Sequence, residues 1–532
     1  MIYNPLEDYQ DKYKPAHSQK VAAFFDQLVA KSRVDIEENR RTVNEIAKYR
    51  EQLKQLKRKR NWLRFLRVLL CITILLIPLV IMKLTPKIRE LKSAIDEAEN
   101  RAEDLQQQAN NQMLPLNKLF DAWDSIKLIE EVMPLISFED KLTIEQEQNM
   151  KQNFDFRDPQ ENEKSTLDTL AGNFNGNPFL FEKRLVHEMG VETYHGYKTI
   201  SWTETYRDSN GKLQTRTRTQ TLHATVTKPK PFYQEQVVLH YGAQGGPELC
   251  FSRDASHLEQ KSEQQIERIV KRGEKKLQRL NEKAIRENDD FMSMANSDFE
   301  VLFDALDRTD EVQYRSLFTP LAQTNMVDLI LSKIGYGDDF HFIKRKRMNT
   351  ILTKHSQGRA LLLPTSSYTS YSYDIIRSNF ISKNEEFFKA IYFDLAPVLA
   401  IPMYQERPVH SLDPIPETPQ LFSLRECEAL ANRVNHSHMV HPDTKTQYIL
   451  KTSYLKSAGG ADETKVTAYS YDKEARVDIV SVYGGDGRYH NVSVPWDEYL
   501  PLTAENDFFV SYLDIAKNSS VLADRNGLCI YN

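Results

Sequence analysis

Residues Trp62 to Leu84 read WLRFLRVLLCITILLIPLVIMKL, and the expected organisation of the whole chain depends on this stretch. Its centre, from Val68 to Met82, holds fifteen residues without a charge. Trp62 and Lys83 flank that centre as interfacial anchors do. The pattern predicts one membrane-spanning helix, with a buried helix of a globular core as the alternative.

Basic residues gather on one side of this stretch. Residues 41–67 carry ten Lys and Arg against two Glu. The positive-inside rule then predicts a single-pass protein of the cell membrane with a cytoplasmic N-terminus, and it leaves the side of the C-terminal region open. The four cysteines are scattered and predict neither a disulfide framework nor a CxxC metal site.

Two further helical patterns surround the predicted span. Residues 18–60 have apolar residues at helical spacing and no Pro or Gly, which predicts one long amphipathic helix. Residues 88–109 keep a/d spacing over three heptads. The second pattern indicates a short coiled coil or a helix that packs on its own chain, and homo-oligomerisation is possible.

The period changes from helical to two between residues 175 and 255. Ile200, Trp202, Glu204 and Tyr206 share one face before the turn signal DSNG at 208–211, which predicts a β-hairpin with a polar tip beyond the core. Residues 233–241 are expected to form the next strand. The GGDG sequence at 484–487 predicts a second hairpin in a small antiparallel sheet.

The predicted fold class is α+β, with an N-terminal helix, one transmembrane helix, a short coiled coil and a mixed region with antiparallel sheets. Residues 386–404 are apolar and favour a core strand over a second span. The expected division of the chain is 1–61 basic amphipathic helix, 62–84 transmembrane helix, 85–138 helical stalk, 139–164 linker, 165–255 antiparallel β region, 256–295 basic helix, 296–404 α+β core, 405–420 Pro-rich linker and 421–532 small β region.

One helical stretch, residues 268–286, carries eight basic residues against Glu274 and Glu282. Such a stripe could tether the protein to anionic lipid or nucleic acid, or it could be a solvated helix face. Because no nucleic-acid-binding module surrounds it and no aromatic pattern interleaves with it, the sequence disfavours a nucleic-acid partner.

The histidines in NHSHMVHPD form the only metal-like cluster in the sequence: His436, His438 and His441. A His-x-His pair on one side of a strand with a third ligand nearby could hold zinc, although histidines in a loop are commonly solvent-exposed. Asp338, Asp339 and His341 form a weaker polar group. No phosphate-binding loop, GxSxG or HExxH sequence occurs, so no catalytic or organic-cofactor residue is nominated.

Residues Asp298 to Ile330, DFEVLFDALDRTDEVQYRSLFTPLAQTNMVDLI, have the features Phe299-Glu300, Phe303, Asp310-Glu311, Arg315 and Thr319-Pro320. In these the stretch resembles an uncharacterised bacterial family of membrane-anchored proteins, a domain of unknown function. The resemblance implies an α+β domain behind N-terminal membrane helices and no activity. That family tends to carry two membrane segments, whereas one is expected here. Thr319 before Pro320 is also typical of a capped helix start.

The sequence therefore favours a membrane-anchored, non-catalytic interaction or scaffold protein with a protein partner, and it leaves open whether the protein is an enzyme. One alternative is a metal-binding enzyme or sensor that uses His436, His438 and His441. The other is a tether through the basic helix 268–286.

Overall fold

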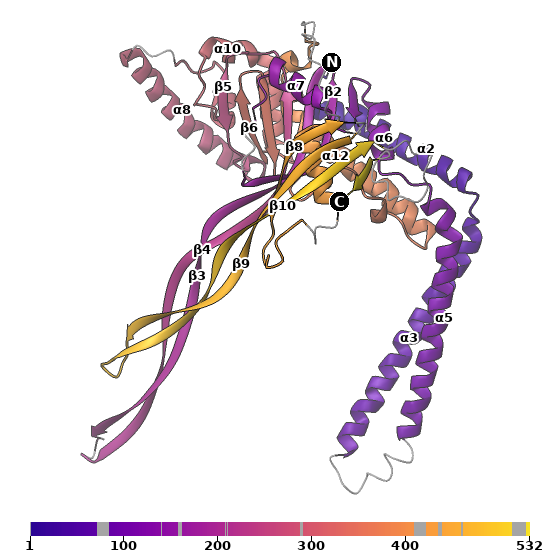
Figure 1. Ribbon diagram of the computed structural model, residues 1–532, viewed down its shortest axis with the longest axis vertical. Coiled ribbons are helices and arrows are strands. Elements are labelled where there is room, and N and C mark those ends of the chain that lie inside the picture. The colour runs from indigo at the N-terminus through magenta and orange to yellow at the C-terminus, as the bar shows by residue number, and fades with distance from the viewer. Residues whose placement is uncertain are drawn as a thin grey trace. The chain divides into compact units, whose positions relative to one another are not determined.

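A computed structural model describes residues 2–71, 84–139, 141–157, 162–207, 209, 211–287, 291–408, 422–434, 439–458, 461–512 and 528–531. These residues belong to two compact units, each described by itself below (Figure 1). The sheet unit falls within Met1–Leu6, Leu135–Leu361 and Phe393–Asn532, and the helical unit within Glu7–Pro134 and Leu362–Tyr392. The predicted α+β class with antiparallel sheets is confirmed.

The helical unit packs through aromatic side chains. The ring of His17 stacks on Phe388 with centroids 4.2 Å apart, and Phe25 lies 5.3 Å from Phe380. The short helix α1 (Pro5–Asp8) and a π-helical turn at Tyr9–Tyr13 precede its main helices. These are α2 (Lys14–Ser32), α3 (Ile36–Cys71), α5 (Thr85–Asn117), α6 (Asp124–Val132) and most of α12 (Tyr373–Leu399).

Helices α3 and α5 pack along their length. Leu53 of α3 is buried against Ile95, Ala98 and Ala102 of α5, and Lys57 pairs with Glu99 at 2.6 Å. The a/d residues of α5 therefore pack on a helix of the same chain, which is one of the two arrangements that the heptad pattern allowed.

The single helix predicted over residues 18–60 is wrong, because the chain turns between α2 and α3. Arg33 adopts a left-handed backbone conformation with φ 55° and ends α2. Asp35 then accepts a hydrogen bond from the backbone N–H of Glu38 at 2.9 Å and caps α3. Neither signal involves Pro or Gly, so a pattern search for helix breakers does not find the turn.

No helix in the part of the chain that the structure describes is long and apolar enough to cross a membrane. This finding contradicts the predicted transmembrane helix at 62–84, and with it the membrane as a partner and the single-pass location in the cell membrane. Within that stretch, residues up to Cys71 belong to α3, where Arg64 and Arg67 follow a basic segment, and residues 72–83 lie outside the described residues.

The first sheet of the sheet unit has seven antiparallel strands in the order β1-β2-β3-β4-β7-β6-β5. Phe251 of β5 packs on Phe303 and Phe318, with centroids 5.8 Å away in both cases, so the helical segment 297–331 covers this edge of the sheet. The strands are β1 (Ile136–Glu139), β2 (Lys164–Phe174), β3 (Asn177–Arg207), β4 (Leu213–Gly242), β5 (Cys250–Arg253), β6 (Phe340–Arg345) and β7 (Met348–Thr353).

Several helices belong to the same unit. The predicted cap at Thr319 is confirmed, because its hydroxyl accepts from the backbone N–H of Ala322 at 3.4 Å at the start of α11. The helices are α7 (Ile144–Asn153), α8 (Glu263–Glu287), α9 (Ser297–Phe303), α10 (Glu311–Leu317), α11 (Pro320–Leu331) and α13 (Leu424–Arg433).

The second sheet is the small antiparallel sheet that the sequence predicted. Its order is β11-β10-β9-β8, and α13 packs on it through Cys427 and Leu430, which are buried with Phe508. The strands are β8 (Ile449–Ala458), β9 (Ala461–Tyr483), β10 (Tyr489–Tyr512) and β11 (Leu528–Tyr531). Tyr483 pairs with Tyr489 around the predicted GGDG turn.

Both sheets extend into long two-stranded ribbons that run side by side (Figure 1). Pairing of β3 with β4 continues to Arg207 and Leu213, far beyond the last described partners of these strands on β2 and β7. We call the paired ribbons, residues 187–207, 213–237, 470–483 and 489–502, the arm. The expected separate strand at 233–241 is part of the continuous strand β4.

The two ribbons of the arm pack face to face. Ile200, Leu222 and Ala224 of the first ribbon are buried against Val492 and Val494 of the second. Alternate residues of a strand point to the same side, so these apolar side chains form one inner layer between the ribbons. A second small core therefore lies between the two ribbons, beyond the sheets.

Polar contacts hold the ribbons in register. The Lys198 ammonium donates to the carbonyl oxygen of Asn491 at 3.0 Å, and the backbone N–H of Gly485 donates to the Gln220 side-chain oxygen at 2.7 Å. Lys228 pairs with Asp478 at 2.7 Å and lies 4.2 Å from the ring centroid of Trp496.

The core strand expected at residues 386–404 is wrong as well. Most of these residues form the last turns of α12, and side chains all around the helix are buried, among them Phe388, Tyr392 and Leu395. An apolar run of this kind lacks a polar face, so periodicity does not distinguish a buried helix from a buried strand.

Replacing Gly196 by Val will separate the ribbons. A Cβ atom at position 196 would lie 2.3 Å from the carbonyl oxygen of Ser493, so the two backbones must move apart. Hydrogen exchange of residues 477–496, measured by mass spectrometry, should become at least tenfold faster. Thr199→Val changes an exposed residue on the opposite face and serves as the control. Unchanged exchange in Gly196→Val would contradict the packing.

Candidate functional site

The outer face of the first ribbon, β3–β4, carries three pairs of hydroxyl groups across the strands. Thr193 lies 3.3 Å from Thr227, Thr199 lies 3.3 Å from Thr221, and Ser201 lies 3.2 Å from Thr219, all between side-chain oxygens. These residues are exposed and alternate with the buried inner residues. The hydroxyl groups of this threonine face bond to one another, and exposed Val191 and Tyr197 lie on the same face.

The outer face of the second ribbon, β9–β10, differs in chemistry. Its exposed residues include Val477, Ile479, Tyr483 and Tyr489, whose exposed fractions are 60%, 67%, 59% and 73%. The two tyrosine rings contact each other with centroids 5.2 Å apart, and exposed Pro495 pairs with Val477 across the strands. We call these five residues the outer strip.

The outer strip is a candidate protein-binding site. Large apolar side chains exposed together on one surface are characteristic of interaction sites, whereas single exposed ones are common and carry no meaning. The inner face of the same ribbon already packs on Ile200 and Leu222, so the strip is not needed for the arm to hold together.

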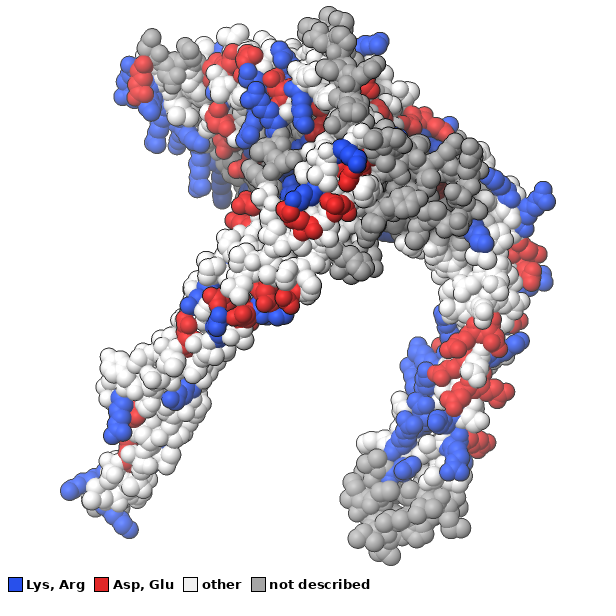
Figure 2. Space-filling view, in the orientation of Figure 1, with Lys and Arg blue, Asp and Glu red and all other residues white. Residues whose placement is uncertain are grey.

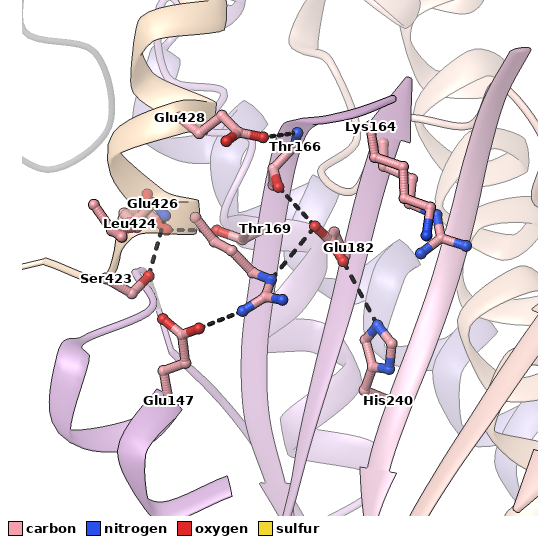
Figure 3. Close-up of polar contacts among 12 residues, drawn as sticks. Glu147, Lys164, Thr166, Thr169, Glu182, His240, Ser423, Leu424, Glu426 and Glu428 are labelled. Carbon is pink, nitrogen blue, oxygen red and sulfur yellow. Dashed lines mark hydrogen bonds and ion pairs between the residues drawn. The ribbon is translucent and has the colours of Figure 1, made fainter. Parts of the chain in front are cut away.

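A buried ionic network connects the two sheets at the other end of these strands (Figure 3). Arg425 of α13 forms ion pairs with Glu147 of α7 and, at 3.6 Å, with Glu182 of β3. Glu182 accepts a hydrogen bond from the Thr166 hydroxyl at 2.6 Å and lies 3.5 Å from Nε2 of His240. The guanidinium group also lies over the ring of Phe156.

Two carboxylates of α13, Glu426 and Glu428, complete the network. Glu426 accepts from the backbone N–H of Leu142 at 3.1 Å and from the Thr169 hydroxyl at 2.5 Å. Glu428 pairs with Lys451 of β8 at 3.0 Å and accepts from the backbone N–H of Thr166. One helix is thereby bonded to strands of both sheets.

Burial and charge act against each other on these groups. Burial alone would raise the pKa of Glu182, but the hydrogen bond from His240 and the charge of Arg425 lower it well below its ordinary range. Burial raises the pKa of Glu428, and Lys451 offsets only part of that effect. Since the side chains of Glu147, Glu182 and Arg425 are at most 5% exposed, the network serves to join elements rather than to meet a ligand.

A second ionic cluster centres on Asp394, near the end of α12. His355 lies 3.2 Å from Asp394 and 2.6 Å from Asp339, and Asp394 also pairs with Arg359. Burial would lower the pKa of His355, but Asp394 and Asp339 raise it to about 9. Burial would raise the pKa of Asp394, but Arg359 and His355 lower it to about 2.

A cleft of about 330 Å³ lies between α7 and strands β1 and β2. Its polar lining consists mostly of side-chain amides, with Glu139 and Arg407 as charged groups. Its volume is at the small end of the range for ligand sites. The described residues of the lining include no Ser, Cys, His or Lys, so they contain no hydroxyl, thiol or amine nucleophile.

The histidines predicted to bind a metal are placed only in part. His436 and His438 lie outside the described residues. His441 accepts a hydrogen bond from the backbone N–H of Asp443 at 3.2 Å and lies 3.6 Å from its carboxylate. The searched portion of the chain contains no group of three or more potential metal ligands, and the zinc site at these histidines stays a prediction.

The weaker predicted polar group does not form one site. Asp338 pairs with buried Arg253, Asp339 with His355, and His341 with Asp254 at 2.9 Å. The three neighbours in sequence therefore have three separate partners.

Sequence reasoning also missed the outer strip. Val477, Ile479 and Tyr483 alternate with inner residues that include Val480 and Val482, so both faces of β9 carry apolar residues and the pattern does not show which face is exposed.

Replacing Arg425 by Leu should destabilise the sheet unit. The change leaves Glu147 and Glu182 buried without their cation, and breaking a buried pair on one side costs about 3–5 kcal/mol. Urea unfolding measures the loss. The control is Arg476→Leu, which breaks an exposed pair with Glu498 and should cost far less than Arg425→Leu. Equal losses in the two variants would contradict the account of the network.

The raised pKa of His355 predicts a pH dependence of stability. Its contribution is complete below the unfolded pKa of 6.5 and is lost as the pH rises through about 9. His355→Gln should therefore be less stable than the wild type at pH 6, and the difference should shrink by about 1–3 kcal/mol by pH 10. Urea unfolding at both pH values tests this, and a constant difference would refute it.

Comparison with protein-family models, with curated proteins and with solved structures found no match to this chain. The resemblance of residues 298–330 to an uncharacterised family therefore stays a prediction.

Proposed function

We propose that this chain is a non-catalytic interaction protein that docks a protein partner on the outer strip of its arm. The observation that carries the proposal is the exposure of Ile479, Tyr483 and Tyr489 on a ribbon whose other face is already packed. Tyrosine and large aliphatic side chains supply most of the binding energy in protein interfaces.

The construction of the arm supports this role. Two-stranded ribbons are marginal by themselves, and the inner layer around Val492 and Val494 gives this pair a core. Lys198 and Gln220 bond to the backbone of the second ribbon and restrict sliding. A rigid binding surface loses less conformational entropy when a partner docks.

The chemistry of the strip defines the partner. The charged residues next to the strip in the ribbon pair with one another, Lys473 with Asp497 at 2.9 Å and Arg476 with Glu498 at 2.7 Å. The surface that fits is an apolar, largely uncharged protein face. Around Thr199 and Ser201 the threonine face presents paired hydroxyl groups, and this part of it serves as an internal comparison.

A photo-crosslinking amino acid in place of Ile479 should give a discrete adduct with the partner in cells. The same amino acid at Thr199, on the threonine face, should give little or none. Adding Tyr483→Ser and Tyr489→Ser to the labelled Ile479 protein should lower the yield at least fivefold, because each exposed aromatic anchor contributes about 1–3 kcal/mol.

The mass of the adduct identifies the partner. An adduct of twice the mass of the chain would show that a second copy, rather than another protein, occupies the strip. Equal yields from positions 479 and 199, or no adduct at position 479, would contradict the proposed function.

A further inference from the structure

Helix α8 (Glu263–Glu287) displays a dense row of cations on one side (Figure 2). At 100° per residue, its basic residues fall within an arc of about 140°. The row comprises eight exposed side chains, here called the basic row: Arg268, Lys271, Arg272, Lys275, Lys276, Arg279, Lys283 and Arg286. No aliphatic or aromatic residue of the helix falls inside this arc.

The opposite side of α8 is fixed to the sheet unit. Leu277 and Ala284 are buried, and a Cβ atom on Gly273 would lie 2.4 Å from the side chain of Val301 in α9. The Glu274 carboxylate accepts a hydrogen bond from the Ser297 hydroxyl at 2.9 Å. The helix cannot rotate without losing these contacts, so the basic row keeps facing outward.

Most of the cations have no anionic partner among the residues that the structure describes. The two weak pairs are Lys276 with Asp304 at 3.8 Å and Lys283 with Glu287 at 3.6 Å, both more than half exposed. Exposed pairs of this kind contribute little and open readily. The unpaired members are Arg268, Lys271, Arg272, Lys275 and Arg279.

The length and spacing of the basic row match a linear polyanion. From Arg268 to Arg286 the row is about 27 Å long, at 1.5 Å per residue. Each strand of duplex DNA presents a phosphate about every 3.4 Å along the helix axis, so several phosphates lie within reach of the row. Protein–nucleic acid interfaces are much more positively charged than protein–protein interfaces.

We propose that the basic row of α8 binds the phosphodiester backbone of a double-stranded nucleic acid without sequence preference. An acidic protein partner fits less well, because protein interfaces need apolar or aromatic anchors and the arc has none. A single strand fits less well because it is held by stacking on aromatic rings. An interfacial lipid-binding helix needs a free apolar face, whereas Leu277 and Ala284 of α8 are buried and Gly273 packs on Val301 of α9, which leaves Ile285 as its one strongly exposed aliphatic side chain.

The structure thus extends what the sequence showed. The absence of a recognition module and of aromatic residues excludes base reading, but contact with the backbone requires neither. The proposal does not depend on the outer strip.

The test measures binding of a fluorescent 24-base-pair DNA duplex to the full-length protein between 50 and 200 mM salt. With four or five phosphate contacts, the logarithm of the association constant should fall against the logarithm of the salt concentration with a slope of about −4. The variant K271Q/K275Q/R279Q should bind at least tenfold more weakly at 50 mM salt and have a slope shallower by about 2–3. An RNA duplex of the same sequence shows which kind of duplex is preferred.

The matched control is K54Q/R58Q/K59Q, which removes three exposed cations from α3 instead. It should keep the affinity and the salt slope of the wild type. Failure of the wild type to bind either duplex, or an equal loss in both variants, would overturn the proposal. Competition by poly-glutamate at the same charge concentration as effectively as by the duplex would also overturn it, in favour of an acidic protein.

Discussion

The arm depends on the burial of one apolar layer between two ribbons that could not persist separately. A two-stranded ribbon has a face that no third strand or helix covers, and it is marginal in water. Here Ile200 and Leu222 on one ribbon meet Val492 and Val494 on the other, so each ribbon supplies the cover that the other needs. Gly196 permits the closest approach because a side chain there would collide with Ser493. Because the inner faces of the two ribbons pack on each other, the outer faces are not needed for this packing and differ in chemistry.

The base of the arm is held by charges rather than by apolar packing alone. Arg425 joins α13 to α7 and β3, while Glu426 and Glu428 of the same helix reach β2 and β8. Such buried networks are costly to dehydrate, but once formed they strongly penalise any shift that separates the partners. The two sheets, which are far apart in sequence, thereby keep the geometry that brings their long hairpins together. The arm and its base are therefore one construction.

The sequence predicted much of the local structure of the arm but not its assembly. Alternation around Ile200 and Trp202 and the GGDG turn indicated both hairpins correctly, because strand period and turn chemistry are local. Nothing local showed that Val492 would meet Leu222, since that contact joins residues far apart in the chain. The apolar stretch at residues 62–84 led to the prediction of a membrane helix, which is wrong. Residues 386–404 were assigned to a strand because a fully buried helix has no polar face. The outer strip was missed because apolar residues lie on both faces of β9, so the sequence pattern does not show which face is exposed.

The most direct measurement concerns the layer between the ribbons. Methyl-labelled protein allows nuclear Overhauser effects to be recorded between isoleucine, leucine and valine side chains. The packing predicts cross-peaks from Ile200 and Leu222 to Val492 and Val494, together with the peak between Ile200 and Leu222 within the first ribbon. Detection of the peak within the first ribbon without any peak to Val492 or Val494 would show that the ribbons do not pack, and would contradict the account of the arm.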